Sequence, residues 1–120
     1  MTAPNMVNIT SMVGKSLCAV VPVSLGTLLA NAASSNKVLK VNTLIITNVD
    51  GTSGSDVSVQ HNDANGQSNY LAYQITVPAK TNLVLISKDT SLYLEEGADL
   101  KIMSSTSLDL AAHVSYEEIE

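Results

Sequence analysis

Apolar and polar residues alternate along most of this chain, in short runs that are separated by polar turns. The clearest run covers residues 108–116, where Leu108, Leu110, Ala112, Val114 and Tyr116 alternate with mostly polar residues. A period of two predicts strands with one buried face, because successive side chains of a strand point to opposite sides. About eight such segments recur every 8–12 residues or so, which is typical of a β-sandwich. We therefore predict an all-β fold, a single antiparallel β-sandwich that resembles a jelly roll.

The two longest alternating runs predict which side chains enter the core. In residues 37–49, alternate residues from Leu39 to Val49 share one face, and Leu44 and Ile46 add a second apolar face. The middle of this strand is therefore expected to be covered on both sides. In residues 69–77 the expected apolar face consists of Leu71, Tyr73, Ile75 and Val77. Tyr70 would then lie on the face opposite Tyr73, which argues against a shared aromatic platform.

Residues 77–102 contain three short apolar segments, Leu83–Ile86, Leu92–Leu94 and Leu100–Ile102, separated by two polar turns. Two turns in so short a span predict antiparallel neighbours, because a parallel crossover needs about a dozen residues or more. We interpret this stretch as a β-meander in which Leu94 points into the core.

The first thirteen residues contain apolar side chains without a clear period. We divide the chain into an N-terminal arm, residues 1–13, and a β-sandwich domain, residues 14–120, whose first strand is expected at Ser16–Val23. The domain core has no obvious place for the side chains of the arm, so we expect them to bind a partner protein. The alternative is a frayed terminus. The expected partner-binding residues are Met6, Val7, Ile9 and Met12.

Charge and composition exclude several functions. The net charge is −5 and the chain has no arginine, so it lacks the basic surface on which nucleic-acid binding depends. The apolar run Leu17–Leu29 is too short for a membrane span, and Pro22 and Gly26 interrupt it. We expect neither nucleic acid nor a membrane as a partner. A single cysteine, Cys18, excludes an internal disulfide, and its apolar neighbours predict a buried, unreactive side chain.

Candidate catalytic and metal-binding residues are few. The segment Asp50–Asp56 resembles part of a calcium loop, but it lacks the alternating carboxylates and the final Glu, and its residues are those of an ordinary turn. Glu95 and Glu96 would point to opposite faces of a strand. His61 and His113 have no spacing that links them to Cys18 or to a carboxylate. The sequence therefore predicts no catalytic, cofactor-binding or metal-binding residue and no enzyme.

Several segments of the chain together carry a resemblance to a known protein family. They are VPAKTNLVLISKDTSLYLEEGADLKI at 77–102, SYEEI at 115–119, NAASSNKVLKVNTLIITNVDGT at 31–52, and PNMVN at 4–8 followed by Gly14-Lys15. In these segments, which cover most of its length, the chain resembles a family of small virion structural proteins of tailed bacteriophages, notably those of cyanobacteria. The resemblance implies a non-enzymatic virion component that is assembled in the host cytoplasm.

Within this resemblance, the expected function is to decorate or cement the capsid. The expected partner is the major capsid protein, and the chain is expected to form a symmetric homo-oligomer such as a trimer. One alternative is a neck or tail component, including a fibre. A further alternative is a carbohydrate-binding or adhesion module, because β-sandwiches also host that function. Exposed aromatic residues beside a groove would favour this last alternative.

Overall fold

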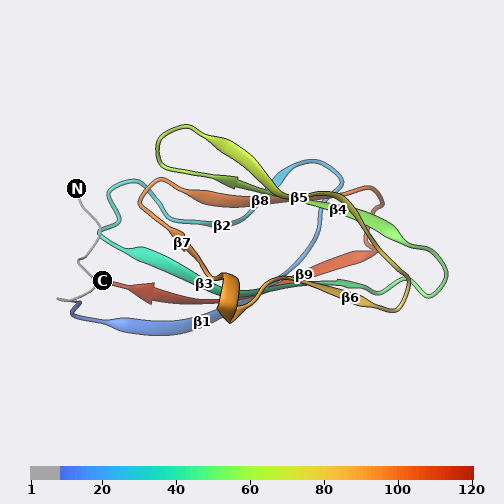
Figure 1. The fold of residues 1–120 in the computed structure, drawn as a ribbon, viewed down its shortest axis with the longest axis horizontal. Coiled ribbons are helices and arrows are strands. Elements are labelled where there is room, and N and C mark those ends of the chain that lie inside the picture. The colour runs from blue at the N-terminus through green and yellow to red at the C-terminus, as the bar shows by residue number, and fades with distance from the viewer. Residues whose placement is uncertain (1–8) are drawn as a thin grey trace.

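The computed structural model describes residues 9–120, which form two antiparallel sheets packed face to face (Figure 1). The first sheet consists of β1 (Met12–Val20), β3 (Val38–Asn48), β6 (Asn82–Ile86), β7 (Leu92–Leu94) and β9 (Leu110–Ile119). The second sheet consists of β2 (Gly26–Ala30), β4 (Ser55–Asn62), β5 (Ser68–Val77) and β8 (Asp99–Ser104). A single 3-10 turn, η1 (Lys88–Thr90), lies between β6 and β7. The predicted all-β sandwich is confirmed.

The order of the strands is that of a jelly roll. In the first sheet the order is β1-β9-β3-β6, with β7 also paired to β3, and in the second it is β2-β8-β4-β5. Among the described strands, only the β4–β5 and β6–β7 connections stay within one sheet. At every other connection the chain crosses to the opposite sheet. When β6 and β7 are taken as one interrupted strand, two four-stranded sheets result, which is the jelly-roll arrangement.

The core between the sheets is almost entirely aliphatic. Leu110, Ala112 and Val114 of β9 are buried, as their alternation predicts. They meet Val57 and Val59 of β4, which belong to the same buried cluster. Removing aliphatic surface from water is the main favourable term in such a core, at about 25 cal/mol per Å². The predicted alternation fails at Leu108, which precedes β9, has a positive φ of 66° and is 73% exposed.

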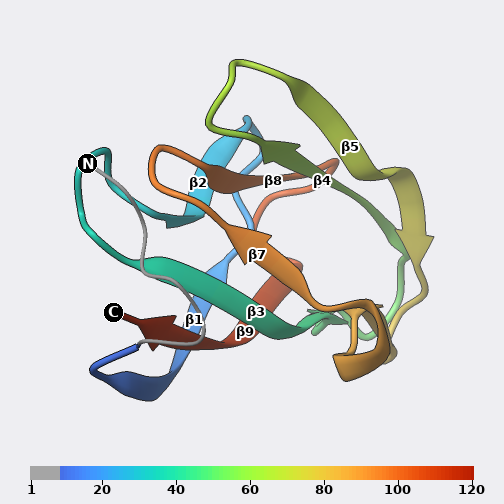
Figure 2. The ribbon, with the colours of Figure 1, turned by 60° about the vertical axis from the view of Figure 1, so that its left-hand side comes forward.

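The predicted β-meander over residues 77–102 is wrong, although all three of its strands form. Both β6 and β7 pair with β3 and not with each other, and β8 belongs to the opposite sheet. The turn η1 offsets the chain without reversing it, so β6 and β7 run in the same direction along one edge of β3. Gly97, with φ of 88°, lies in the turn that then carries the chain to β8 in the other layer (Figure 2).

The predicted two-sided burial of β3 is wrong, because a bulge changes which of its side chains face the core. Val41 pairs with Tyr116 and Thr43 with Ser115, so Asn42 is one residue in excess over β9. An extra residue reverses the alternation beyond it. The core face therefore contains Leu39 and Val41 before the bulge, and Leu44 and Ile46 after it.

Bulges in β5 also overturn the predicted apolar face of residues 69–77. Val57 pairs with Ile75 and Val59 with Ala72, which places one extra residue in β5 near Gln74, whose φ is 50°. As a result Ala72 and Val77 are buried, whereas three of the residues expected in the core are exposed. These exposed residues are Leu71, Tyr73 and Ile75.

The first strand begins earlier than the sequence predicts. β1 spans Met12–Val20, so the last two residues of the expected arm pair with Ile119 and Glu118 of β9. Backbone hydrogen bonds also join Ser11 to Glu120, with N···O distances of 2.8 and 2.9 Å. These bonds hold the start of the described chain beside its C-terminus, at one end of the sandwich (Figure 1).

Candidate functional site

The expected partner-binding residues fall at the start of β1. Met6 and Val7 lie outside the described residues, Ile9 is half-buried, and Met12 is the first residue of β1 with 49% of its surface exposed. Val13 is exposed to 48% and Val20, at the other end of the strand, to 56%. Exposed apolar side chains therefore lie at both ends of β1, Met12 and Val13 at its start and Val20 at its end.

Among residues 9–120, β1 is an edge strand with no strand on its second side. Among the described residues it pairs with β9 alone, over nine residue pairs without a shift in register. Ser11 exchanges both backbone bonds with Glu120, and the amide of Val21 donates to the carbonyl of Leu110 at 2.9 Å. Hydrogen-bonded pairs alternate in an antiparallel ladder. The even-numbered residues therefore point their backbone N–H and C=O groups away from β9, and these are Met12, Gly14, Ser16, Cys18 and Val20.

Cys18 is exposed, so the prediction of a buried thiol is wrong. Its neighbours Leu17 and Ala19 pack against the core from the inner face of β1, and alternation places Cys18 on the outer face. The residue paired with it on β9 is the exposed His113. The local sequence could not show this, because in a run of apolar residues the sequence does not indicate which face of the strand points outward.

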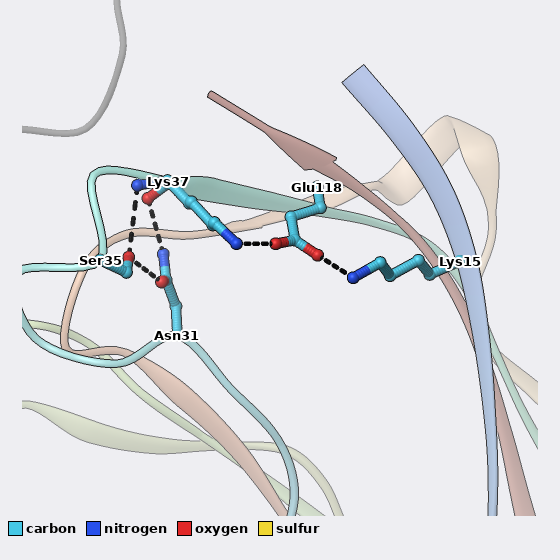
Figure 3. Close-up of polar contacts among 5 residues, drawn as sticks. All are labelled: Lys15, Asn31, Ser35, Lys37 and Glu118. Carbon is cyan, nitrogen blue, oxygen red and sulfur yellow. Dashed lines mark hydrogen bonds and ion pairs between the residues drawn. The ribbon is translucent and has the colours of Figure 1, made fainter. Parts of the chain in front are cut away.

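An ion-pair cluster joins β1, β9 and the loop before β3 (Figure 3). The carboxylate of Glu118 on β9 binds the ammonium groups of Lys15 on β1 and Lys37 just before β3. Hydrogen bonds from Lys15 and Lys37, together with their positive charges, lower the pKa of Glu118 below its ordinary value. The hydrogen bond to Glu118, reinforced by its negative charge, raises the pKa of Lys37. The cluster joins three segments that are distant in the sequence.

Asn31, next to this cluster, is a buried polar residue that the sequence analysis missed. Its side-chain amide donates to the carbonyl of Lys37 at 2.8 Å, and its Oδ1 accepts from Ser35 (Figure 3). The same amide also donates to the carbonyl of Leu94 at 3.0 Å. Buried backbone carbonyls need such donors. A hollow of about 210 Å³ opens beside it, lined partly by Lys37, Tyr116 and Glu118. This network fixes the loop after β2 against β3 and β7.

The ion-pair cluster predicts a specific loss of stability in acid. Because the pKa of Glu118 is lowered on folding, its contribution is present above the ordinary carboxyl pKa and is lost as the pH falls through the lowered value. We expect Glu118→Gln to destabilise the protein at pH 7, and this difference from the native chain to shrink as the pH falls from 5 to about 2. Urea unfolding at several pH values measures it, with the exposed Glu95→Gln as control. A difference that stays constant with pH would contradict the assignment.

Tyr70 and Tyr73 form an aromatic pair on β5, contrary to the prediction that they lie on opposite faces. Their ring centroids are 4.8 Å apart and the ring planes meet at 63°, which is an edge-to-face contact. The rings are 44% and 56% exposed. Gln60 pairs with Tyr70 and Val59 with Ala72, so an extra residue between the two tyrosines turns both to the same side. A separate hollow of about 220 Å³, lined partly by Asp56, Ser58 and Gln74, does not include either tyrosine in its lining.

The remaining candidate residues lie apart from each other. Asp50 accepts hydrogen bonds from Thr52 within its own turn, and Asp56 accepts one from Thr76 at 2.6 Å. Within residues 9–120, no three His, Cys, Asp or Glu side chains are grouped so as to hold a metal ion. The Nε2 atom of His61 is buried and has no hydrogen-bond partner in this part of the chain. No helix in the described structure is long and apolar enough to cross a membrane.

Comparison with known proteins gives little further information. No family model and no curated protein matches the chain. One similar solved structure is described as "Bacillus endospore appendages form a novel family of disulfide-linked pili". The TM-score is 0.49 and the identity 11%, over 99% of this chain and 95% of that one. At this level of similarity no function follows from the match.

Proposed function

We propose that this protein is a non-enzymatic structural component of a bacteriophage virion that decorates or cements the capsid by binding the major capsid protein. The observation that carries the proposal is the apolar exposure where the expected arm meets β1, at Met12 and Val13, which are 49% and 48% exposed. The sequence resemblance to small virion proteins supports it. The jelly roll is also a common fold of viral capsid domains, although a fold does not by itself determine function.

The proposed mechanism is mechanical. A compact sandwich covers a junction between capsid subunits, and apolar side chains of the arm anchor it. Each fully buried aliphatic side chain contributes about 1.5–3 kcal/mol before the cost of ordering is subtracted. The chain has a net charge of −5 and no arginine, so it can form few strong ionic contacts in place of these apolar anchors.

A sedimentation experiment tests this proposal. Phage particles that lack the protein are mixed with the full chain or with the variant Met6→Ser/Val7→Ser/Ile9→Ser, and then pelleted. These substitutions precede β1 and leave its pairing with β9 intact. We expect the native chain to sediment with the particles and the variant to remain in solution. Val84→Ser, which changes an exposed residue on the opposite edge of the same sheet, is the matched control and should sediment normally. Equal sedimentation of all three proteins would show that the arm is not the anchor.

One observation favours the carbohydrate-binding alternative. The exposed Tyr70–Tyr73 pair is an aromatic surface of the kind on which sugar rings stack, and Gln74, next to Tyr73 in the sequence, lines a polar hollow. Jelly rolls also occur in lectin domains. Binding to an array of bacterial surface glycans that is lost in Tyr73→Ala would favour this alternative. If the native chain and Tyr73→Ala bind glycans equally, or if neither binds them, the tyrosines do not form a carbohydrate site.

A further inference from the structure

The edge strands of this sandwich differ in how they are protected against pairing with another chain. β2 has five residues and a shift in register, β6 has five and also a shift, and β7 has three. β5 is long, but its two bulges and the positive φ of Gln74 distort it. Short strands and bulges are the features by which natural sheets block edge-to-edge pairing. β1 has nine residues in unbroken register and neither a bulge nor a proline.

Charge does not protect β1 either. Its one charged residue, Lys15, has its backbone groups turned toward β9 and its ammonium group bound to Glu118 of the same chain. The residues whose backbone groups face outward are uncharged, namely Met12, Gly14, Ser16, Cys18 and Val20. A Cβ built on Gly14 would meet no atom of the described residues within 4 Å, so no side chain covers the face of β1 at this point. A second strand can therefore approach this edge without placing charges opposite each other.

We propose that β1 pairs with β1 of a second copy of this chain, antiparallel and about a two-fold axis through Ser16. Ser16 is the middle residue of Met12–Val20, and its outward backbone groups allow the hydrogen-bonded pair that this axis requires. The strand is self-complementary in this register. Met12 lies opposite Val20 of the second copy, Val13 opposite Ala19, and Gly14 opposite Cys18. Two sheets then join into one sheet that continues across the dimer.

The self-complementarity is what selects a second copy as the occupant. Both ends of the paired strands bring together exposed apolar side chains, Met12 at 49% and Val20 at 56% exposure. Ser16 meets its own copy on the axis, and Lys15 lies opposite the apolar Leu17. An isologous contact of this kind is the usual basis of homodimers. It makes a dimer, and not a trimer, the basic unit of the homo-oligomer. The inference concerns self-assembly alone, so a chain that dimerises without binding particles would leave it intact.

Mass measurement tests the pairing. Light scattering on the full chain should give twice the monomer mass of 12.6 kDa at high concentration, dissociating on dilution. Ser16→Lys places two like charges opposite each other on the axis and should give a monomer. A monomeric native chain at every concentration, a trimer, or a Ser16→Lys variant that is still dimeric would each overturn the proposal.

Cysteine cross-linking tests the register and does not depend on the lysine variant folding. In Ser16→Cys/Cys18→Ser the two thiols face each other, and mild oxidation should produce a disulfide-linked dimer. In the native chain the two Cys18 residues lie four positions apart, about 13 Å along the strand, which is too far for a disulfide. The native chain and Asn69→Cys/Cys18→Ser, whose cysteine is exposed on the β5 edge, should stay unlinked. Linking of the native chain, or equal linking of both variants, would contradict the register.

Discussion

Leu94→Asp should leave the chain unable to fold. Leu94 is completely buried in β7, and its partner Leu39 on β3 belongs to the same core. The substitution removes a large aliphatic side chain, which alone costs about 2–5 kcal/mol, and adds a carboxylate that has no partner in the core. Domains of this size are stable by about 5–15 kcal/mol, so the combined cost removes most or all of the stability.

Tyr93→Asp is the matched control for this experiment. Tyr93 is the preceding residue of the same strand, is 45% exposed, and pairs with Lys40. Its substitution should leave a folded protein with a slightly lower stability. Soluble expression and far-ultraviolet circular dichroism with urea unfolding distinguish the two outcomes. A soluble Leu94→Asp protein that unfolds cooperatively would show that the register of β7 on β3 is wrong.

Asn48→Leu should cost about 3 kcal/mol or more of unfolding free energy, because it leaves two carbonyls without their donor. Asn48 ends β3 and is 1% exposed. Its amide donates to the carbonyls of Ser53 at 3.0 Å and Val77 at 2.8 Å, and its Oδ1 accepts from the backbone of Asp50 at 2.9 Å. One side chain therefore fixes the β3–β4 loop to the end of β5.

Asn42→Leu provides the comparison for Asn48→Leu. Asn42 lies on the same strand, is half-exposed, and makes one side-chain hydrogen bond, to Glu117 at 2.8 Å. Its substitution should cost about 1 kcal/mol or less. Urea unfolding measures both values. Equal costs for the two substitutions would contradict the bridging role of Asn48.

Strand positions could be predicted from the sequence where turn residues bound a short apolar run. β7 has the predicted bounds Leu92–Leu94 because polar turns lie on either side of it. The inner face of β9 follows from its alternation, from Leu110 to Val114. The class of fold depends on the number and spacing of such runs, and so it was predictable.

The sequence could not predict which side chains of β3 and β5 face the core. Nor could it predict the strands with which β6, β7 and β8 pair. Asn42 and Gln74 occupy bulges, yet neither residue is a glycine or is flanked by turn residues that would indicate one. The bulges reverse the alternation, and they bring Tyr70 and Tyr73 together. The exposure of Cys18 depends on which face of β1 points away from the other sheet. The partners of a strand are set by long-range packing, which a local pattern does not contain.

The buried asparagines and the ion-pair cluster were missed for the same reason. Asn31 and Asn48 stand at strand ends, where polar residues are common and their burial cannot be predicted. Glu118 contacts Lys37, which is 81 residues earlier in the sequence, and Lys15, which is earlier still, so no spacing rule links them. A polar residue directly at the end of an apolar run, as both asparagines are, is the one local signal that could have indicated them.

The number of copies of this protein per virion tests the proposed capsid function most directly. Quantitative mass spectrometry of purified particles gives the ratio of this chain to the major capsid protein. Decoration of the shell predicts a ratio on the order of one copy for each few capsid subunits, in keeping with repeated symmetric contacts on a closed shell. A ratio that corresponds to a single ring at the neck or tail would contradict capsid decoration, and absence from the particle would contradict the virion function altogether.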